Sequence, residues 1–235
     1  MTSTVERPAS PDPAPEPERT ASASAGWLPF LCIVVAIVLV AGSAISWIAS
    51  PNWGKHNPIA NARDVGNVPA SAVRATAGSR VAPVALDLAP NRIVIQKLGT
   101  DASVFAIDTE NGTLEPPIDP RQVGWWRGGA KPGATTGTAV ITGHINYAGV
   151  TGAMARIGTL DPGDKVWIYG QRNGKQTRME FTITGVRTYI KKTLPYTEIF
   201  NQNVDGRLAL ITCGGPFDAS TGNYLDNIVA YAVPA

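Results

Sequence analysis

The sequence contains only two cysteines among its 235 residues, Cys32 and Cys213. Cys32 lies inside a long uncharged run that is expected to sit in lipid, whereas Cys213 lies far downstream in a segment expected in water. Because the two sulfurs are not expected to pair, an exported domain of this chain must be held together by an ordinary hydrophobic core. Cys213 is left as a lone thiol, which marks it as a candidate reactive residue.

The chain also lacks a large excess of charge of one sign, since its formal net charge is only +2. No block of Lys and Arg is interleaved with aromatic residues, which argues against a nucleic-acid-binding protein. No acidic residues cluster like metal ligands, because Asp161 and Asp164 flank a turn and are more typical of residues that set it. The glycine-rich run at 128–133 lacks the spacing and the Lys-Ser/Thr ending of a phosphate-binding loop. We therefore expect no metal and no cofactor.

Two segments lack the patterns of folded structure. Residues 1–26 are rich in Pro, Ala, Ser and Thr and contain no aromatic residue. Such a stretch cannot bury enough apolar surface to offset the entropy of ordering it, so a disordered tail is predicted. Residues 50–89 are rich in Pro, Ala, Asn, Ser and Gly and show no sustained periodicity. They are predicted to form a stalk or linker.

Between these segments, residues 27–49 form an apolar run without a charged residue. At about 1.5 Å of rise per residue this run reaches roughly 34 Å, enough to cross a bilayer core of about 30 Å. Trp27 and Trp47 lie near its ends, where indole rings favour the headgroup region. We expect a single transmembrane helix. The alternative is a cleaved signal peptide, with Ala41-Gly42-Ser43-Ala44 as a small-residue cleavage site.

From residue 90 to residue 235, short apolar runs alternate with turn residues. Several runs alternate polar and apolar positions and are rich in Val, Ile and Thr, as expected of half-buried strands. Asn173-Gly174 is typical of a two-residue hairpin connection, and only Ala153–Leu160 and Leu194–Phe200 suggest short helices. We predict a mainly antiparallel β-barrel of seven or eight strands. The predicted strands are Arg92–Ile95, Val104–Ile107, Thr138–Thr142, Lys165–Tyr169, Met179–Val186, Leu208–Thr212 and Ile228–Val233.

The sequence also has only two histidines. His56 lies in the predicted stalk, whereas His144 stands where the strand at 138–142 gives way to a loop. Cys213 repeats this arrangement at the exit of the strand at 208–212, and two glycines follow it. Taken alone, a histidine at a strand end is usually structural or merely exposed, and Cys213 is as readily structural as catalytic. Adjacent strands of one small barrel could bring the pair to one rim, where a cysteine thiolate attacks a carbonyl and a histidine gives a proton to the leaving amine.

These two residues lie in stretches that resemble the motifs of the sortases, the cell-wall transpeptidases of Gram-positive bacteria. Thr142-Gly143-His144 is similar to the sortase histidine motif, and Ile211-Thr212-Cys213 is similar to the cysteine motif. The separation of 69 residues suits a sortase domain. Other stretches resemble actinobacterial class F, with class E as the alternative: residues 123–126, 137–144, 160–164 and 211–218. Within the first of these, Trp125 and Trp126 could line a substrate groove or pack in the core.

The resemblance implies an eight-stranded sortase-type barrel at 90–235, held outside the cell membrane by a single-pass helix, without a catalytic metal. Residues 1–26 would then be cytoplasmic and residues 50–89 extracellular. Cys213 would attack the threonine carbonyl in a Leu-Pro-x-Thr-Gly-like sorting signal of a secreted protein, and His144 would protonate the departing amine. An amine of a peptidoglycan precursor would resolve the thioester.

One feature departs from the family pattern. Sortases carry an arginine on the strand after the cysteine to stabilise the oxyanion, but this chain has no Arg or Lys after Arg207. Asn227 could supply a neutral donor instead, or Arg127, Arg187 or Arg207 could reach the site from elsewhere. Alternatively the enzyme is weak or inactive, as in a degenerate sortase-like module that only binds sorting signals or a partner. A cysteine hydrolase without transfer is the third function left open.

Overall fold

The computed structural model describes residues 58–69 and 85–235. The predicted tail at 1–26 and the predicted membrane segment at 27–49 lie outside these residues, together with much of the predicted stalk. In the described part of the chain, no helix is both long enough and apolar enough to span a bilayer.

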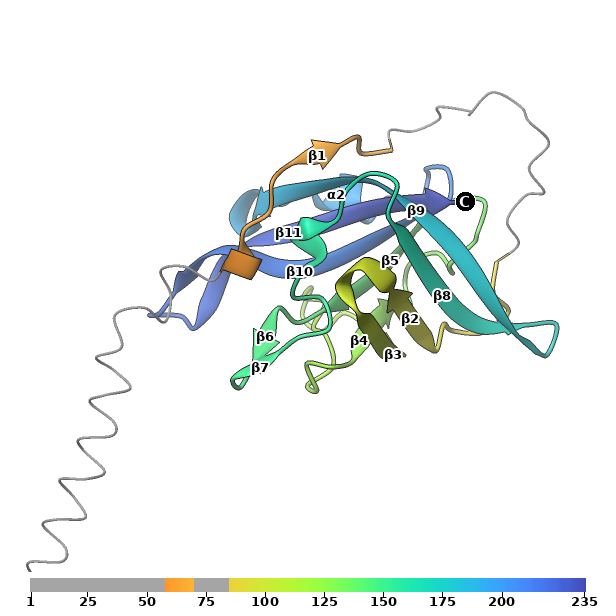
Figure 1. Cartoon of the computed structure of the whole chain (residues 1–235), viewed down its shortest axis with the longest axis horizontal. Coiled ribbons are helices and arrows are strands. Elements are labelled where there is room, and N and C mark those ends of the chain that lie inside the picture. The colour runs from red at the N-terminus through yellow and green to blue at the C-terminus, as the bar shows by residue number, and fades with distance from the viewer. Residues whose placement is uncertain (1–57, 70–84) are drawn as a thin grey trace, which may run out of the picture. The chain divides into compact units, whose positions relative to one another are not determined.

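Eight strands form a sheet that closes on itself (Figure 1). The order around the ring is β9-β11-β10-β5-β4-β3-β2-β8, and β8 pairs again with β9. The predicted class, a mainly β fold with a closed eight-stranded barrel, is confirmed. The barrel strands are β2 (Arg92–Ile95), β3 (Thr100–Ile107), β4 (Val123–Trp126), β5 (Thr138–Gly143), β8 (Lys165–Arg172), β9 (Lys175–Ile190), β10 (Arg207–Asp218) and β11 (Asn223–Pro234).

Strands β8 and β9 show how the local sequence specifies the barrel. In β8 the buried residues Val166 and Ile168 alternate with more exposed neighbours, which is the period of a half-buried strand. The two strands are joined through Asn173-Gly174, and Arg172 pairs with Lys175 across the turn. Both turn residues have positive φ, 50° and 70°. This geometry is the one that favours Asn-Gly in two-residue hairpins, so the predicted turn is confirmed.

The sheet around β5 and β10 is buried on both faces. Aliphatic side chains fill the barrel interior, and a second apolar cluster covers the outer face. That outer cluster contains Val140, Ile211 and Tyr231 from the sheet, and Leu194 and Ile199 from the connection between β9 and β10. Burial on both faces explains why all six residues of β5 are buried and why Ala139, Val140 and Ile141 follow one another without a polar residue between them.

The sequence prediction missed one barrel strand, β4. Its four residues, Val-Gly-Trp-Trp, are too few to show an alternating pattern, and glycine is a weak strand former. Neighbours on both sides stabilise this strand, because β4 pairs in parallel with β3 and antiparallel with β5. The predicted Trp pair is divided between two roles. Trp125 is buried in the core and donates its indole N–H to the Ala130 carbonyl at 3.1 Å, whereas Trp126 lines a cleft.

The remaining elements are short. The predicted helix at Ala153–Leu160 contains only the 3-10 turn η3 (Ile157–Thr159), and the one at Leu194–Phe200 contains α2 (Tyr196–Ile199). The others are η1 (Pro58–Ala60), β1 (Val65–Gly66), η2 (Gln96–Leu98), β6 (Asn146–Tyr147), β7 (Val150–Thr151) and η4 (Lys191–Thr193).

Part of the segment predicted as a stalk lies against the barrel. Strand β1 pairs antiparallel with β9, with Val65 opposite Val186. The Arg187 guanidinium donates to the carbonyls of Val65 and Gly66, each at 2.7 Å, and fixes β1 in this position. Ala60 is buried in a small apolar cluster with residues that follow His144 in the chain. These contacts connect the segment at 58–66 to the side of the barrel that carries the candidate site.

Candidate active site

Strands β5 and β10 bring His144 and Cys213 to the same level of the sheet, where β5 ends. The predicted strand exit at Cys213 is wrong, because β10 continues to Asp218 through its pairing with β11. Strands β5 and β10 run in parallel, and their register places Arg207 opposite Thr138 and Ile211 opposite Thr142. Each of these pairs differs by 69 in residue number, as do Cys213 and His144. The two candidate residues therefore stand at the same level, two positions beyond the last paired residues. Thr212 donates its hydroxyl to the Gly143 carbonyl at 2.8 Å and connects the end of β5 to β10.

His144 is half-buried at the end of β5. Its ring packs against Tyr147, with centroids 5.0 Å apart and an interplanar angle of 30°. The Gly152 backbone packs directly against the backbone of His144. A Cβ at Gly152 would lie 1.9 Å from the His144 carbonyl oxygen, so only glycine fits at that position. Burial lowers the pKa of His144 below its ordinary value, although the Pro117 carbonyl and the nearby Glu115 carboxylate oppose that shift. The imidazole is therefore mostly neutral at neutral pH and is suited to accept a proton.

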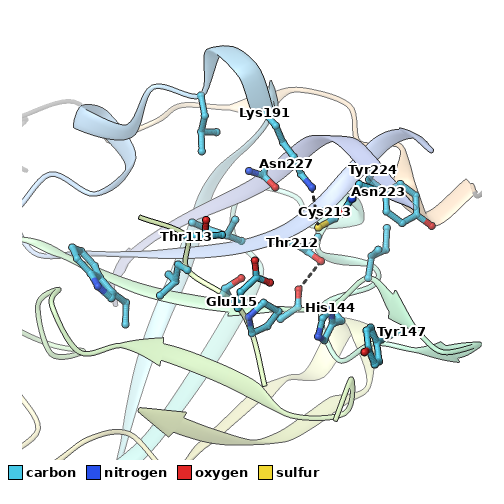
Figure 2. Close-up of a pocket in the computed structure, with 18 of the residues that line it drawn as sticks. Thr113, Glu115, His144, Tyr147, Lys191, Thr212, Cys213, Asn223, Tyr224 and Asn227 are labelled. Atoms are coloured by element: carbon cyan, nitrogen blue, oxygen red, sulfur yellow. Dashed lines mark hydrogen bonds between the residues drawn. The ribbon is translucent and has the colours of Figure 1, made fainter. Parts of the chain in front are cut away.

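Cys213 is half-buried on β10 and lies opposite Asn227 of β11. The ladder shifts register by a bulge between Gly214 and Phe217, just after the cysteine, which is a usual way to re-aim a strand next to a functional residue. The Lys191 ammonium lies 3.5 Å from the Cys213 sulfur, and Figure 2 shows the lysine side chain directed at it. The thiol is thus accessible on one side and faces a positive charge on another.

Both residues line one cleft of about 570 Å³. Its walls come from the β3–β4 connection, the end of β5, the middle of β10, the start of β11, and the connection between β9 and β10. One end is apolar and includes Leu114, Leu194 and the edge-to-face pair Trp126 and Phe200. A cleft of this size with an apolar end and a few polar groups suits a short peptide. Within the described ranges, no three His, Cys, Asp or Glu side chains are placed to hold a metal ion.

The three candidate arginines do not line this cleft. Arg127 pairs with Asp108 at 3.3 Å, and Arg187 holds β1. Arg207 is only 4 % exposed, and each of its three guanidinium nitrogens donates a hydrogen bond. It donates to the Thr138 hydroxyl at 2.9 Å and to the carbonyls of Pro69 and Glu198. It also lies over the Tyr231 ring. The structure therefore assigns Arg207 to the packing of the β9–β10 connection and not to the cleft.

Asn227 does line the cleft, beside Cys213, as its place in the sequence predicted. Lys191 was not among the predicted residues. Its approach to Cys213 depends on how β9, β11 and β10 are aligned, which no pattern near Lys191 in the sequence shows. The one signal in the sequence was indirect: the absence of any cation after Arg207 meant that a positive charge in the cleft had to come from earlier in the chain.

The comparisons with known proteins agree with the motifs. The family model described as a sortase domain matches residues 93–235, which is more than half of the chain. The chain therefore belongs to the sortase family, a family of cysteine transpeptidases that act on sorting signals. A comparison with curated proteins gave no match.

Several solved structures are similar to the chain. A lid mutant of sortase A from Corynebacterium diphtheriae is 20% identical, with a TM-score of 0.46, and the match covers 63% of this chain and 70% of that one. Sortase C-1 from Actinomyces oris is 19% identical, with a TM-score of 0.47 and coverage of 63% and 76%. A sortase D5 transpeptidase from Clostridium perfringens is 18% identical, with a TM-score of 0.45 and coverage of 63% and 79%.

Proposed function

We propose that this chain is a cysteine transpeptidase that cleaves a Leu-Pro-x-Thr-Gly-like sorting signal, with Cys213 as its nucleophile and His144 as its general base and acid. The observation that carries this proposal is the register of β5 and β10, which sets the two side chains at the same level at the wall of one cleft. A reactive thiol in a partly exposed position beside a cation is the arrangement expected of a catalytic cysteine.

The neutral His144 accepts the thiol proton as the sulfur attacks the threonine carbonyl. A C–S bond forms and the carbonyl electrons move to the oxygen. The tetrahedral intermediate then collapses, the peptide C–N bond breaks, and His144 returns its proton to the departing amine. The product is a thioester on Cys213. An incoming amine attacks the thioester and gives a proton to His144. The C–S bond breaks as the new amide forms, and His144 returns that proton to the leaving sulfur, which restores the thiol.

The finer assignments rest on the motifs and the apolar segment. The class F-like motifs support an actinobacterial enzyme whose acceptor is an amine of a peptidoglycan precursor and whose donors are secreted proteins with sorting signals. Three of those motif stretches contribute to β4, β5 and β10, which are neighbours in the sheet. The uncharged run at 27–49 supports a single-pass anchor with the catalytic domain outside the cell.

Transfer is tested with the full-length chain in detergent, a sorting-signal peptide and triglycine as the acceptor amine. We expect the ligated peptide as the main product, because the thioester partitions toward a good amine nucleophile. Cleavage that gives the same hydrolysed products with and without triglycine would identify a hydrolase. Peptide binding without cleavage would identify the binding module and contradict the proposal. Mass spectrometry of the products distinguishes all three outcomes.

The pH dependence of kcat/KM tests the role of His144. We expect the acid limb to have its midpoint below pH 6.5, because the reaction needs the neutral imidazole and burial lowers the pKa of His144 from that value. Replacing Glu115 by Gln removes a carboxylate that raises this pKa, so Glu115→Gln should move the limb further down. The exposed Glu110 in the same loop is the matched control, and Glu110→Gln should leave the limb in place. A limb at or above pH 6.5, or one that rises in Glu115→Gln, contradicts this assignment.

A further inference from the structure

One positive charge faces the reactive sulfur. Among the cleft-lining residues in the described part of the chain, Lys191 is the only Lys or Arg. Its ammonium lies 3.5 Å from the Cys213 sulfur. His144 cannot supply a permanent charge here, because burial lowers its pKa and favours the neutral imidazole. The cleft therefore contains one fixed cation, and this cation is in contact with the atom that becomes negative during the reaction.

The strand order explains why Lys191 reaches this position. Asn227 of β11 pairs with Cys213 on one side and with Tyr189 of β9 on the other. Lys191 follows two residues after Tyr189, at the start of η4, and its side chain points toward Cys213 of β10 (Figure 2). Leu194, three residues later, is buried in the outer apolar cluster and anchors this connection. The lysine is thus held by the fold on a partly buried surface.

Two groups besides Cys213 face Lys191. Asp226 is half-buried, and the positive charge of Lys191 partly opposes the rise that burial causes in its pKa. Asn227 is neutral and lies between the strands that carry the lysine and the cysteine. No ion pair joins Lys191 to Asp226 among the described residues, whereas the ammonium does contact the sulfur. The contact geometry therefore favours the cysteine as the partner of Lys191.

We propose that Lys191 is a catalytic residue that stabilises the negative charge on the Cys213 sulfur and then on the oxygen of the tetrahedral intermediate. This inference rests on the proposed transpeptidase function. As the sulfur attacks and its proton passes to His144, the ammonium donates a hydrogen bond to the charge that moves to the carbonyl oxygen. Lys191 acts here only as a hydrogen-bond donor, and the proton that the amine leaving group needs comes from His144.

The first test measures the thiol without any peptide. The full-length chain in detergent carries Cys32→Ala, so Cys213 is its one thiol, and the rate of alkylation by iodoacetamide is followed at pH 7. We expect Lys191→Met to slow alkylation about tenfold, because a nearby cation favours the thiolate, which is the form that reacts. Lys192→Met is the matched control, since Lys192 is adjacent, exposed and outside the cleft lining, and it should react at the parent rate.

The second test measures kcat/KM on the sorting-signal peptide with the same variants. Loss of a donor to the oxyanion should cost on the order of 10²–10³-fold in Lys191→Met. Lys191→Gln should lose nearly as much, whereas Lys191→Arg, which keeps the charge, should retain both rates best. A merely structural lysine would not produce this dependence on charge in variants with equal melting temperatures. Asn227→Ala should have the smaller effect, because the amide is neutral.

The outcomes separate the two proposals. Parental alkylation and turnover in Lys191→Met would overturn the role of Lys191 and leave the transpeptidase intact. A parent protein that never cleaves the peptide would overturn the proposed function, and the alkylation rates would still decide whether Lys191 acts on the thiol. An Asn227→Ala loss larger than that of Lys191→Met would transfer the role to the asparagine and contradict this inference.

Discussion

Replacing Cys213 by alanine is expected to reduce turnover of the sorting-signal peptide to background, a loss on the order of 10⁴-fold or more. No thioester can form without the sulfur, so both cleavage and transfer should disappear together. The substitution removes one heavy atom from a half-buried side chain and leaves the backbone pairing of Cys213 with Asn227 in place. It should therefore leave the melting temperature nearly unchanged. Parallel measurements of kcat/KM and of thermal unfolding check both parts of this prediction.

The other cysteine provides the matched control for this variant. Cys32→Ala makes the same chemical change in the predicted membrane segment and should retain parental turnover. If Cys213→Ala cleaves the peptide as fast as Cys32→Ala, the nucleophile has been assigned wrongly. Such a result would also remove the chemical reason for the pairing with His144.

Replacing His144 by glutamine is expected to reduce kcat/KM by about 10²–10⁴-fold, the usual contribution of general acid–base catalysis. The loss should depend on the leaving group. An amide needs a proton on its departing amine, whereas an ester of the same sequence releases an alcohol that leaves more easily. We therefore expect the loss in His144→Gln to be much smaller for the ester substrate than for the peptide.

His56 is the matched control for this second prediction, because it is the chain's only other histidine. His56→Gln should cleave both substrates at the parental rates. Equal losses for ester and amide in His144→Gln would show that the histidine does not protonate the leaving group. Its contact with Tyr147 would then be structural.

Much of the barrel could be predicted because its strands show local patterns. The alternating residues of β8 and the Asn-Gly turn depend only on neighbours in sequence, so their strand and hairpin were recognisable. Strand β4 was not, because its pairing partners are β3 and β5 and its own four residues carry no period. The parallel pairing of β5 with β10 was also invisible in the sequence, since no local signal distinguishes a parallel neighbour from an antiparallel one.

The candidate site divides in the same way. His144 and Cys213 follow apolar runs in the sequence and belong to recognisable motifs, so local sequence was enough to select them. Arg207 was a wrong candidate for the cleft, because it lies too far from Cys213 along the extended strand β10. Six residues of extended chain separate it from Cys213, roughly 20 Å at about 3.3 Å per residue. Its acceptors include the carbonyls of Pro69 and Glu198, which only the tertiary structure brings together.

Lys191 could not have been selected from sequence, because its proximity to the sulfur is a property of three aligned strands. Asn227 pairs with both Cys213 and Tyr189, and this double pairing positions the end of β9 over the site. The missing cation downstream of Arg207 indicated that a substitute was needed. The structure indicates which residue lies near enough to fill that role.

The central claim is that Cys213 forms a thioester with the substrate. The most direct test is to trap this intermediate during turnover and measure its mass. Full-length protein is mixed with the sorting-signal peptide, quenched in acid, and digested for mass spectrometry. We expect an adduct equal to the peptide fragment that ends at threonine, attached to the fragment containing Cys213 and released by hydroxylamine. An adduct on any other residue, or turnover of the peptide without an adduct on Cys213, would contradict the assignment.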